Sequence, residues 1–102
     1  MSETGLLIIH QTKPGKRDTV KAIWLKQMAP AIQANSGHLA YFYTFDKDDP
    51  DVICAFQLYA SAEAAREFLS HPAYLAYLAE SREFLEQAPQ IKSLAPQWVK
   101  AI

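Results

Sequence analysis

Three histidines, His10, His38 and His71, are the side chains of this 102-residue chain best suited to moving protons near neutral pH. They lie far apart in the sequence and lack the short spacings typical of metal ligands, and the single cysteine adds only one soft ligand. We therefore expect no metal site. His71 and His38 are the residues that we expect to accept a proton if the protein is an enzyme.

The sequence contains none of the strong catalytic motifs. It has no glycine-rich phosphate loop, no HExxH pattern, no paired cysteines and no GxSxG elbow. Cys54 stands in the apolar run "VICAF", where a thiol acts as a small buried hydrophobe with a raised pKa. The aspartates of "DKDDPD" lack the spacing of a calcium loop and are typical of a solvated turn.

Aromatic residues form a second group that could take part in binding or catalysis. Trp24, Tyr41, Tyr43, Tyr59 and Tyr74 could together line an apolar pocket, with phenol groups that orient a flat ligand. The alternative is that these side chains only fill the core. We include all five, together with His10, among the expected substrate-binding residues.

The stretch "SHPAYLAYLAES" allows two interpretations of His71. Pro72 disfavours helical angles at the residue before it and is itself favoured at a first helical position, so a helix begins here. The imidazole could cap this helix, or it could exchange protons at the mouth of a pocket.

A helical wheel for this segment separates two apolar strips. The residues of one strip lie within about 60° of one another on the wheel, which predicts that His71 is at the inner edge of the helix. The other strip could face a partner or a lid. The first strip contains His71, Tyr74, Leu78 and Leu85; the second contains Tyr77 and Phe84.

Periodicity and turn residues indicate six main elements. Apolar spacing of three and four residues predicts helices, and short apolar or alternating runs bounded by Gly, Pro and Asp predict strands. The predicted elements are a strand over 5–12, a helix over about 20–29 with an irregular turn over 31–36, strands over 38–45 and 52–59, a helix over 62–69 continued by one over 72–87, and an edge strand over 90–102 that is interrupted near Pro96.

The element order β-α-β-β-α-β predicts an α+β, ferredoxin-like fold in a single domain over 1–102. Its antiparallel sheet should be covered by helices on one face. Both faces of the strands over 38–45 and 52–59 are largely apolar, however, and helices can hide only one of them. Because monomers seldom expose large apolar patches, we expect a homodimer joined sheet to sheet.

Composition excludes several classes of partner. Half of the residues are apolar, 21% are charged and the formal charge is -1, which indicates a folded protein without a positive field for nucleic acid or anionic lipid. The run "GLLIIHQ" is too short for a membrane span or a signal peptide. With one cysteine and no sign of an oxidising compartment, we expect a cytoplasmic protein.

The run "SGHLAYFYTFDKDDPDVICAFQLYASAEAAREFLSHPAYLAY" resembles the middle of the antibiotic biosynthesis monooxygenase family, and "KPGKRDTVKAIW" is similar to the family's first turn and helix. The resemblance implies a dimeric α+β barrel with a pocket between sheet and helices. It departs from the family pattern at Tyr59, where the family commonly has Trp, and at Phe68 and Ala73, where it commonly has histidines.

The resemblance also implies an activity. Family members include oxygenases that act on quinols or polycyclic aromatic phenols without metal or flavin, so we expect a monooxygenase of this kind with a small aromatic substrate and no cofactor. The alternatives are a dimeric module that binds a small molecule without turnover, and two other activities of the family, haem degradation and sugar-phosphate isomerisation.

Overall fold

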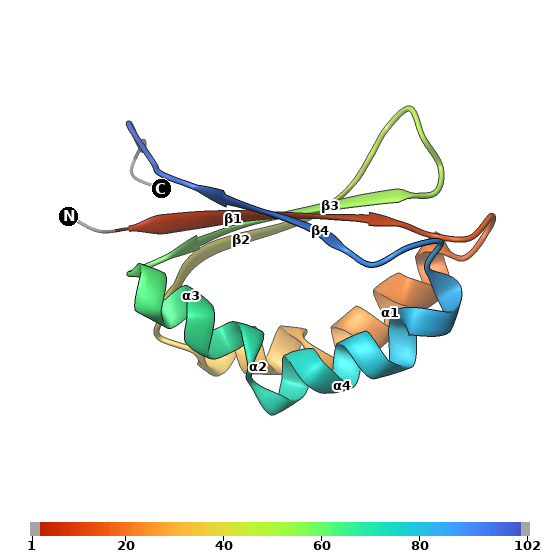
Figure 1. Cartoon of the computed structure of the whole chain (residues 1–102), viewed down its shortest axis with the longest axis horizontal. Helices are drawn as coiled ribbons and strands as arrows, with labels where there is room; N and C mark the ends of the chain where they lie inside the picture. Colours follow the sequence, from red (N-terminus) through yellow and green to blue (C-terminus); the bar gives the residue numbers. More distant parts are fainter. Residues whose placement is uncertain (1–2, 101–102) are drawn as a thin grey trace.

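The computed structural model describes residues 3–100, and within them it has the ferredoxin-like fold expected from the sequence. A four-stranded antiparallel sheet has the order β2-β3-β1-β4, and the helices lie together on one of its faces (Figure 1). The elements in chain order are β1 (Thr4–Gln11), α1 (Arg17–Gln27), α2 (Ala29–Ala34), β2 (His38–Phe45), β3 (Val52–Tyr59), α3 (Ala62–Leu69), α4 (Pro72–Ser81), the single 3-10 turn η1 (Arg82–Phe84) and β4 (Gln90–Leu94).

The alternation of side chains along β1 explains where the core lies. Leu6, Ile8 and His10 point to the helices and are buried, whereas Leu7 and Ile9 point to the opposite face and are only partly buried. The helix side holds the main apolar cluster. It includes Leu6, Val20, Met28, Ile53, Tyr59, Ala65, Phe68, Tyr74, Tyr77 and Leu85.

The expected irregular turn over 31–36 is wrong for most of its length. After α1 ends at Gln27, the chain forms the short helix α2, with Pro30 in its first turn. Proline is tolerated there because the first amides of a helix have no partner within the helix. Pro30 therefore starts a new helix and does not simply end the previous one.

The helix predicted over 72–87 is also shorter than expected. Regular α-helix ends at Ser81, and Leu85 is already extended and forms a β-bridge with Thr12. Two backbone hydrogen bonds fix this return to the sheet, from the Lys13 amide to the Phe84 carbonyl at 2.8 Å and from the Glu86 amide to the Gln11 carbonyl at 2.8 Å. Long-range pairing with the end of β1, and not Pro89, thus stops the helix.

The face of the sheet away from the helices is apolar. This was predicted because both faces of the strands over 38–45 and 52–59 are largely apolar in the sequence. Leu7, Phe56 and Phe42 are neighbours across β1, β3 and β2, and Leu94 of the edge strand β4 lies on the same face. Phe42 is 46% exposed and Leu94 is 40% exposed. Within residues 3–100, no helix is long and apolar enough to cross a membrane.

Candidate active site

Helix α1 and strand β2 bring three of the predicted aromatic residues together. The Trp24 Nε1 donates a hydrogen bond to the Tyr41 Oη at 3.3 Å, and the Trp24 ring stacks on Tyr43 with ring centroids 4.2 Å apart. Burial raises the pKa of Tyr41 to about 12 and also raises the pKa of Tyr43. Both phenols are therefore neutral at pH 7 and available as hydrogen-bonding groups.

A second group forms around His38 at the start of β2. Its ring lies against Tyr59, with centroids 4.3 Å apart, and meets Phe68 edge-on at 4.6 Å. The Tyr59 hydroxyl donates to the Gln57 Oε1 at 2.6 Å in the fully buried interior. The Asn35 Nδ2 lies 2.8 Å from the His38 Nδ1.

The third group joins β1 to α4. The His10 Nε2 and the Tyr77 Oη are hydrogen-bonded at 2.9 Å, and both side chains are buried. Burial lowers the pKa of His10 to about 4 and raises the pKa of Tyr77, so both side chains are neutral at pH 7. Tyr74, also buried, stacks near Tyr77 with ring centroids 6.5 Å apart.

Two predictions about α4 are wrong. Tyr77 was assigned to a strip facing a partner or a lid, yet it is buried in the core and contacts His10. His71 was placed at the inner edge of the helix, yet its side chain is exposed. The His71 backbone is extended, which places its ring over the helix end, where its Nδ1 accepts a hydrogen bond from the Ala73 amide at 3.0 Å.

Four polar atoms in the layer between sheet and helices are buried and have no hydrogen-bond partner among the described residues. They are the His10 Nδ1, the His38 Nε2, the Tyr43 Oη and the Gln57 Nε2. Buried polar groups without partners are uncommon because each costs about 1–3 kcal/mol. A small molecule with oxygen functions, bound in this layer, would offset that cost.

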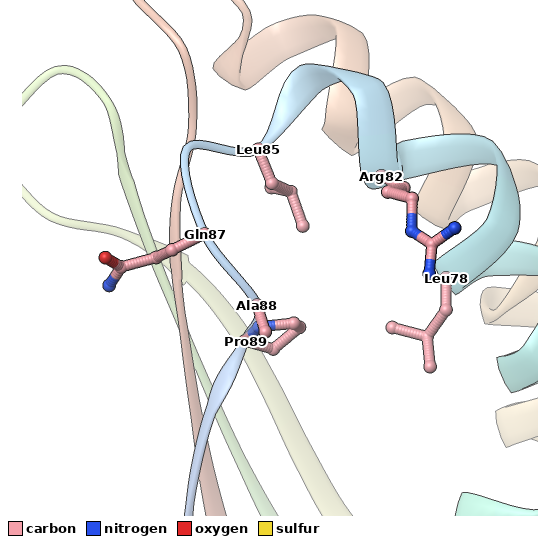
Figure 2. Close-up of a pocket in the computed structure, with 6 residues that line it drawn as sticks. All are labelled: Leu78, Arg82, Leu85, Gln87, Ala88 and Pro89. Carbon is pink, nitrogen blue, oxygen red and sulfur yellow. The ribbon is translucent and has the colours of Figure 1, made fainter.

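Two pockets lie at opposite edges of the sheet. One, of about 410 Å³, lies between the end of α4 and the segment leading into β4. Figure 2 shows Leu78, Leu85 and Pro89 directed into it, whereas Gln87 points away. The other, of about 270 Å³, reaches His38 and Tyr41 beside α2.

No group of three or more His, Cys, Asp or Glu side chains in residues 3–100 is arranged to hold a metal ion. Cys54 is partly buried and lies on the open face of the sheet, away from the aromatic layer, and burial raises the pKa of its thiol. The thiol is thus less deeply placed than the buried position expected from the sequence.

The chain is thus a ferredoxin-like α+β protein with a candidate site between its sheet and its helices. The model of the antibiotic biosynthesis monooxygenase family matches residues 7–80. The chain belongs to that family. A comparison with curated proteins finds no match.

Solved structures share the fold over nearly the whole chain. A protein of Chloroflexus aurantiacus J-10-fl, described as a candidate antibiotic biosynthesis monooxygenase, is 26% identical with a TM-score of 0.81 and 99% of each chain covered. Rv0793 of Mycobacterium tuberculosis is 24% identical, with a TM-score of 0.85 and coverage of 98% of this chain and 100% of that one. A variant of SnoaB, a cofactor-independent oxygenase from Streptomyces nogalater, is 11% identical with a TM-score of 0.81 and 97% of each chain covered.

Acid should destabilise the protein through His10. The folded pKa of about 4 lies below the ordinary value of 6.5, so the unfolded chain takes up the proton first as the pH falls. The free energy of unfolding should therefore drop by about 3 kcal/mol between pH 7 and pH 4 from this group alone. Urea unfolding at several pH values measures it, and His10→Phe should flatten the dependence. Identical pH dependence in the two proteins would show that His10 is not the cause.

His71 should act as a helix cap that asparagine can replace. We expect His71→Ala to lower the free energy of unfolding by about 1 kcal/mol, because the Ala73 amide loses its acceptor. His71→Asn should restore most of that loss, since Asn is a preferred N-cap. If His71→Asn is stable but loses enzymatic turnover, His71 has a chemical role beyond the cap.

Proposed function

We propose that the protein is a cofactor-independent monooxygenase that oxidises an electron-rich aromatic substrate, such as a quinol or an anthrone-like phenol. The observation that carries the proposal is the buried layer of aromatic rings with four unpartnered polar atoms on the helix side of the sheet. Membership of the monooxygenase family supports it, as does the fold shared with SnoaB. We extend the proposal to a cytoplasmic homodimer.

The proposed oxidation requires few catalytic groups from the protein. A deprotonated aromatic substrate can itself supply electrons to molecular oxygen. For an anthrone, one oxygen atom becomes the new carbonyl oxygen, and the other leaves as water with the two hydrogens of the methylene group. The protein must hold the ring, accept a proton and exclude water, which a dry aromatic-lined layer and a buried base can do.

His10 is the proton acceptor that fits this reaction best. The His10 Nε2 and the Tyr77 Oη share a hydrogen bond, and in the tautomer that we propose the Nε2 carries the proton and donates it to the Tyr77 Oη. The unpartnered Nδ1 then presents a lone pair to the layer. Because burial holds the pKa of His10 at about 4, the imidazole is unprotonated at neutral pH.

The aromatic side chains would position the ring system. Trp24 and Tyr43 offer stacked faces, and the Tyr41 Oη, already bonded to the Trp24 Nε1, is fixed in place. Tyr59 and Tyr74 belong to the buried cluster against which Trp24 and Tyr43 pack. Two phenols that stay neutral at pH 7 can donate to a substrate oxygen without themselves competing for the proton acceptor.

Oxygen uptake tests the proposal directly. Purified protein, treated with a chelator and free of flavin, should raise oxygen consumption with at least one member of a panel of quinols and anthrones. His10→Gln should lower the rate by about 10² to 10⁴, the usual contribution of a general base, whereas His71→Asn should keep it. Failure of the whole panel would leave a binding module without turnover as the better description.

The open apolar face should join two copies of the chain. Sedimentation equilibrium at micromolar concentration should give a dimer, and Phe42→Glu should yield a monomer because a charge would be buried in the contact. Leu75→Glu is the matched control, since Leu75 is 52% exposed but lies on α4, in the helix layer. A monomeric wild-type protein, or equal effects of the two substitutions, would contradict the dimer.

A further inference from the structure

The Asn35 side chain joins Gly37 to the His38 ring at the turn that leads from α2 into β2. The Gly37 amide donates to the Asn35 Oδ1 at 3.2 Å, so the oxygen of that side-chain amide faces Gly37. The Asn35 Nδ2 is then the atom 2.8 Å from the His38 Nδ1, and it can only donate. The two contacts therefore coexist only while the His38 Nδ1 presents a lone pair, as in the neutral ring that carries its proton on the Nε2.

Protonation of His38 is incompatible with this arrangement. In the imidazolium both ring nitrogens are donors, so the Nδ1–H would face the N–H groups of Asn35. Rotation of the Asn35 amide by a half turn gives His38 an acceptor. It also turns the amide nitrogen toward the Gly37 N–H, which then loses its partner. With the ring in place, the charged His38 and the Gly37 hydrogen bond exclude each other.

The His38 ring is less free to move than the Asn35 side chain. It lies against Tyr59 with ring centroids 4.3 Å apart and against Phe68 at 4.6 Å, and Tyr41 of the same strand is 5.6 Å away. Asn35 is only half-buried and stands at the end of α2, where its amide can rotate. We therefore expect Asn35, and not the ring, to respond to the proton.

The side chains that face the His38 ring carry no charge at pH 7. They are Asn35 from the turn after α2, Tyr41 from β2, Gln57 and Tyr59 from β3, and Phe68 from α3, on which His71 at the start of α4 stacks in turn. Burial lowers the pKa of His38 below its ordinary 6.5, and the Gln57 side chain, as an acceptor, opposes that lowering. The ring is therefore neutral at pH 7 and takes up a proton only in acid.

The same turn forms part of the wall of the pocket beside α2, which has a volume of about 270 Å³. Asn35 and His38 both line this pocket, together with Tyr41, one of the residues that we expect to position the substrate. The Gly37 carbonyl accepts from the Ala60 amide at 2.9 Å, which ties the turn to the end of β3. Loss of the Gly37 amide bond would remove one of the contacts that hold this wall.

We propose that Asn35, Gly37 and His38 form a pH-sensitive latch in the wall of this pocket. The latch is closed while His38 is neutral. Protonation of the ring turns the Asn35 amide, frees the Gly37 N–H and loosens the wall, so acid opens the latch and neutral pH closes it. Its bearing on substrate entry rests on the proposed function, whereas the latch itself stands on the hydrogen bonds and the packing of the ring.

Nuclear magnetic resonance follows the latch without any ligand. As the pH falls from about 8 to about 5, the Gly37 amide proton should move upfield with the same midpoint as the His38 ring, below 6.5. Its protection against hydrogen exchange should fall about fivefold, the equivalent of one hydrogen bond. His38→Phe should abolish this titration. His71→Phe is the matched control, since His71 also binds a backbone amide through its Nδ1, and should leave Gly37 unchanged.

Asn35→Asp tests the mechanism, because a carboxylate can accept from the Gly37 amide and from a protonated His38 at the same time. The variant should raise the pKa of His38 by about one unit or more, since an opposite charge then lies beside the ring. The upfield movement of the Gly37 amide should be lost. Gln33→Asp, which adds the same charge at an exposed position of α2, is the control and should change the His38 midpoint much less.

Two outcomes would overturn the latch: a Gly37 amide that does not follow the His38 ring, or an unchanged His38 midpoint in Asn35→Asp. If His38→Phe does not fold, Asn35→Asp and its control still decide the question. Loss of oxygen uptake with the titration intact would reject the proposed reaction but keep the latch, and intact oxygen uptake without the titration would reject the latch alone.

Discussion

The organisation of this protein depends on one constraint, that polar side chains buried between sheet and helices must find partners. Two helices are tied to the sheet by such a pair: α1 to β2 through Trp24 and Tyr41, and α4 to β1 through His10 and Tyr77. A purely apolar interior would bury a comparable area without these bonds. Within residues 3–100, the buried side-chain polar atoms that have no partner lie on the helix side of the sheet, which is why we propose this layer as the site.

Because the sheet is pleated, side chains on its two faces have different roles. Side chains that point to the helices form the core and the polar layer, and those that point away form a band of Leu7, Phe56 and Phe42 across three strands. A chain of 102 residues has helices enough for one face only. Gly5 illustrates the tight packing within the open face, because an added Cβ would lie 3.2 Å from the Phe56 ring.

The sequence predicts the fold well because strands and helices here follow local patterns. Alternation and turn residues place β2 and β3 at the residues observed, and the edge position of β4 follows from Pro96. The end of α4 was missed because backbone bonds to Lys13 and Gln11, more than 70 residues away in the chain, decide it. No local pattern reports such a contact.

The site was predicted only in part, for a related reason. Aromatic composition singled out Trp24, Tyr41 and Tyr43, and the structure brings these three together. Gln57 was missed because it sits in an apolar strand run whose two faces look alike, and Tyr77 because a wheel begun at His71 assigned it to the wrong side. A polar residue within an apolar strand was the available signal for Gln57.

The length of the polar layer bears on the substrate that we propose. His10 pairs with Ile53 in the sheet, and Gln57 lies four residues further along β3, which at about 3.3 Å per residue separates them by roughly 13 Å. In the proposed reaction, a substrate whose acidic hydrogen reaches His10 has to be a flat ring system to extend toward the other end of the layer as well. Conjugation through such a ring would carry the negative charge left by deprotonation away from His10, so the length of the layer favours an aromatic substrate over an aliphatic one.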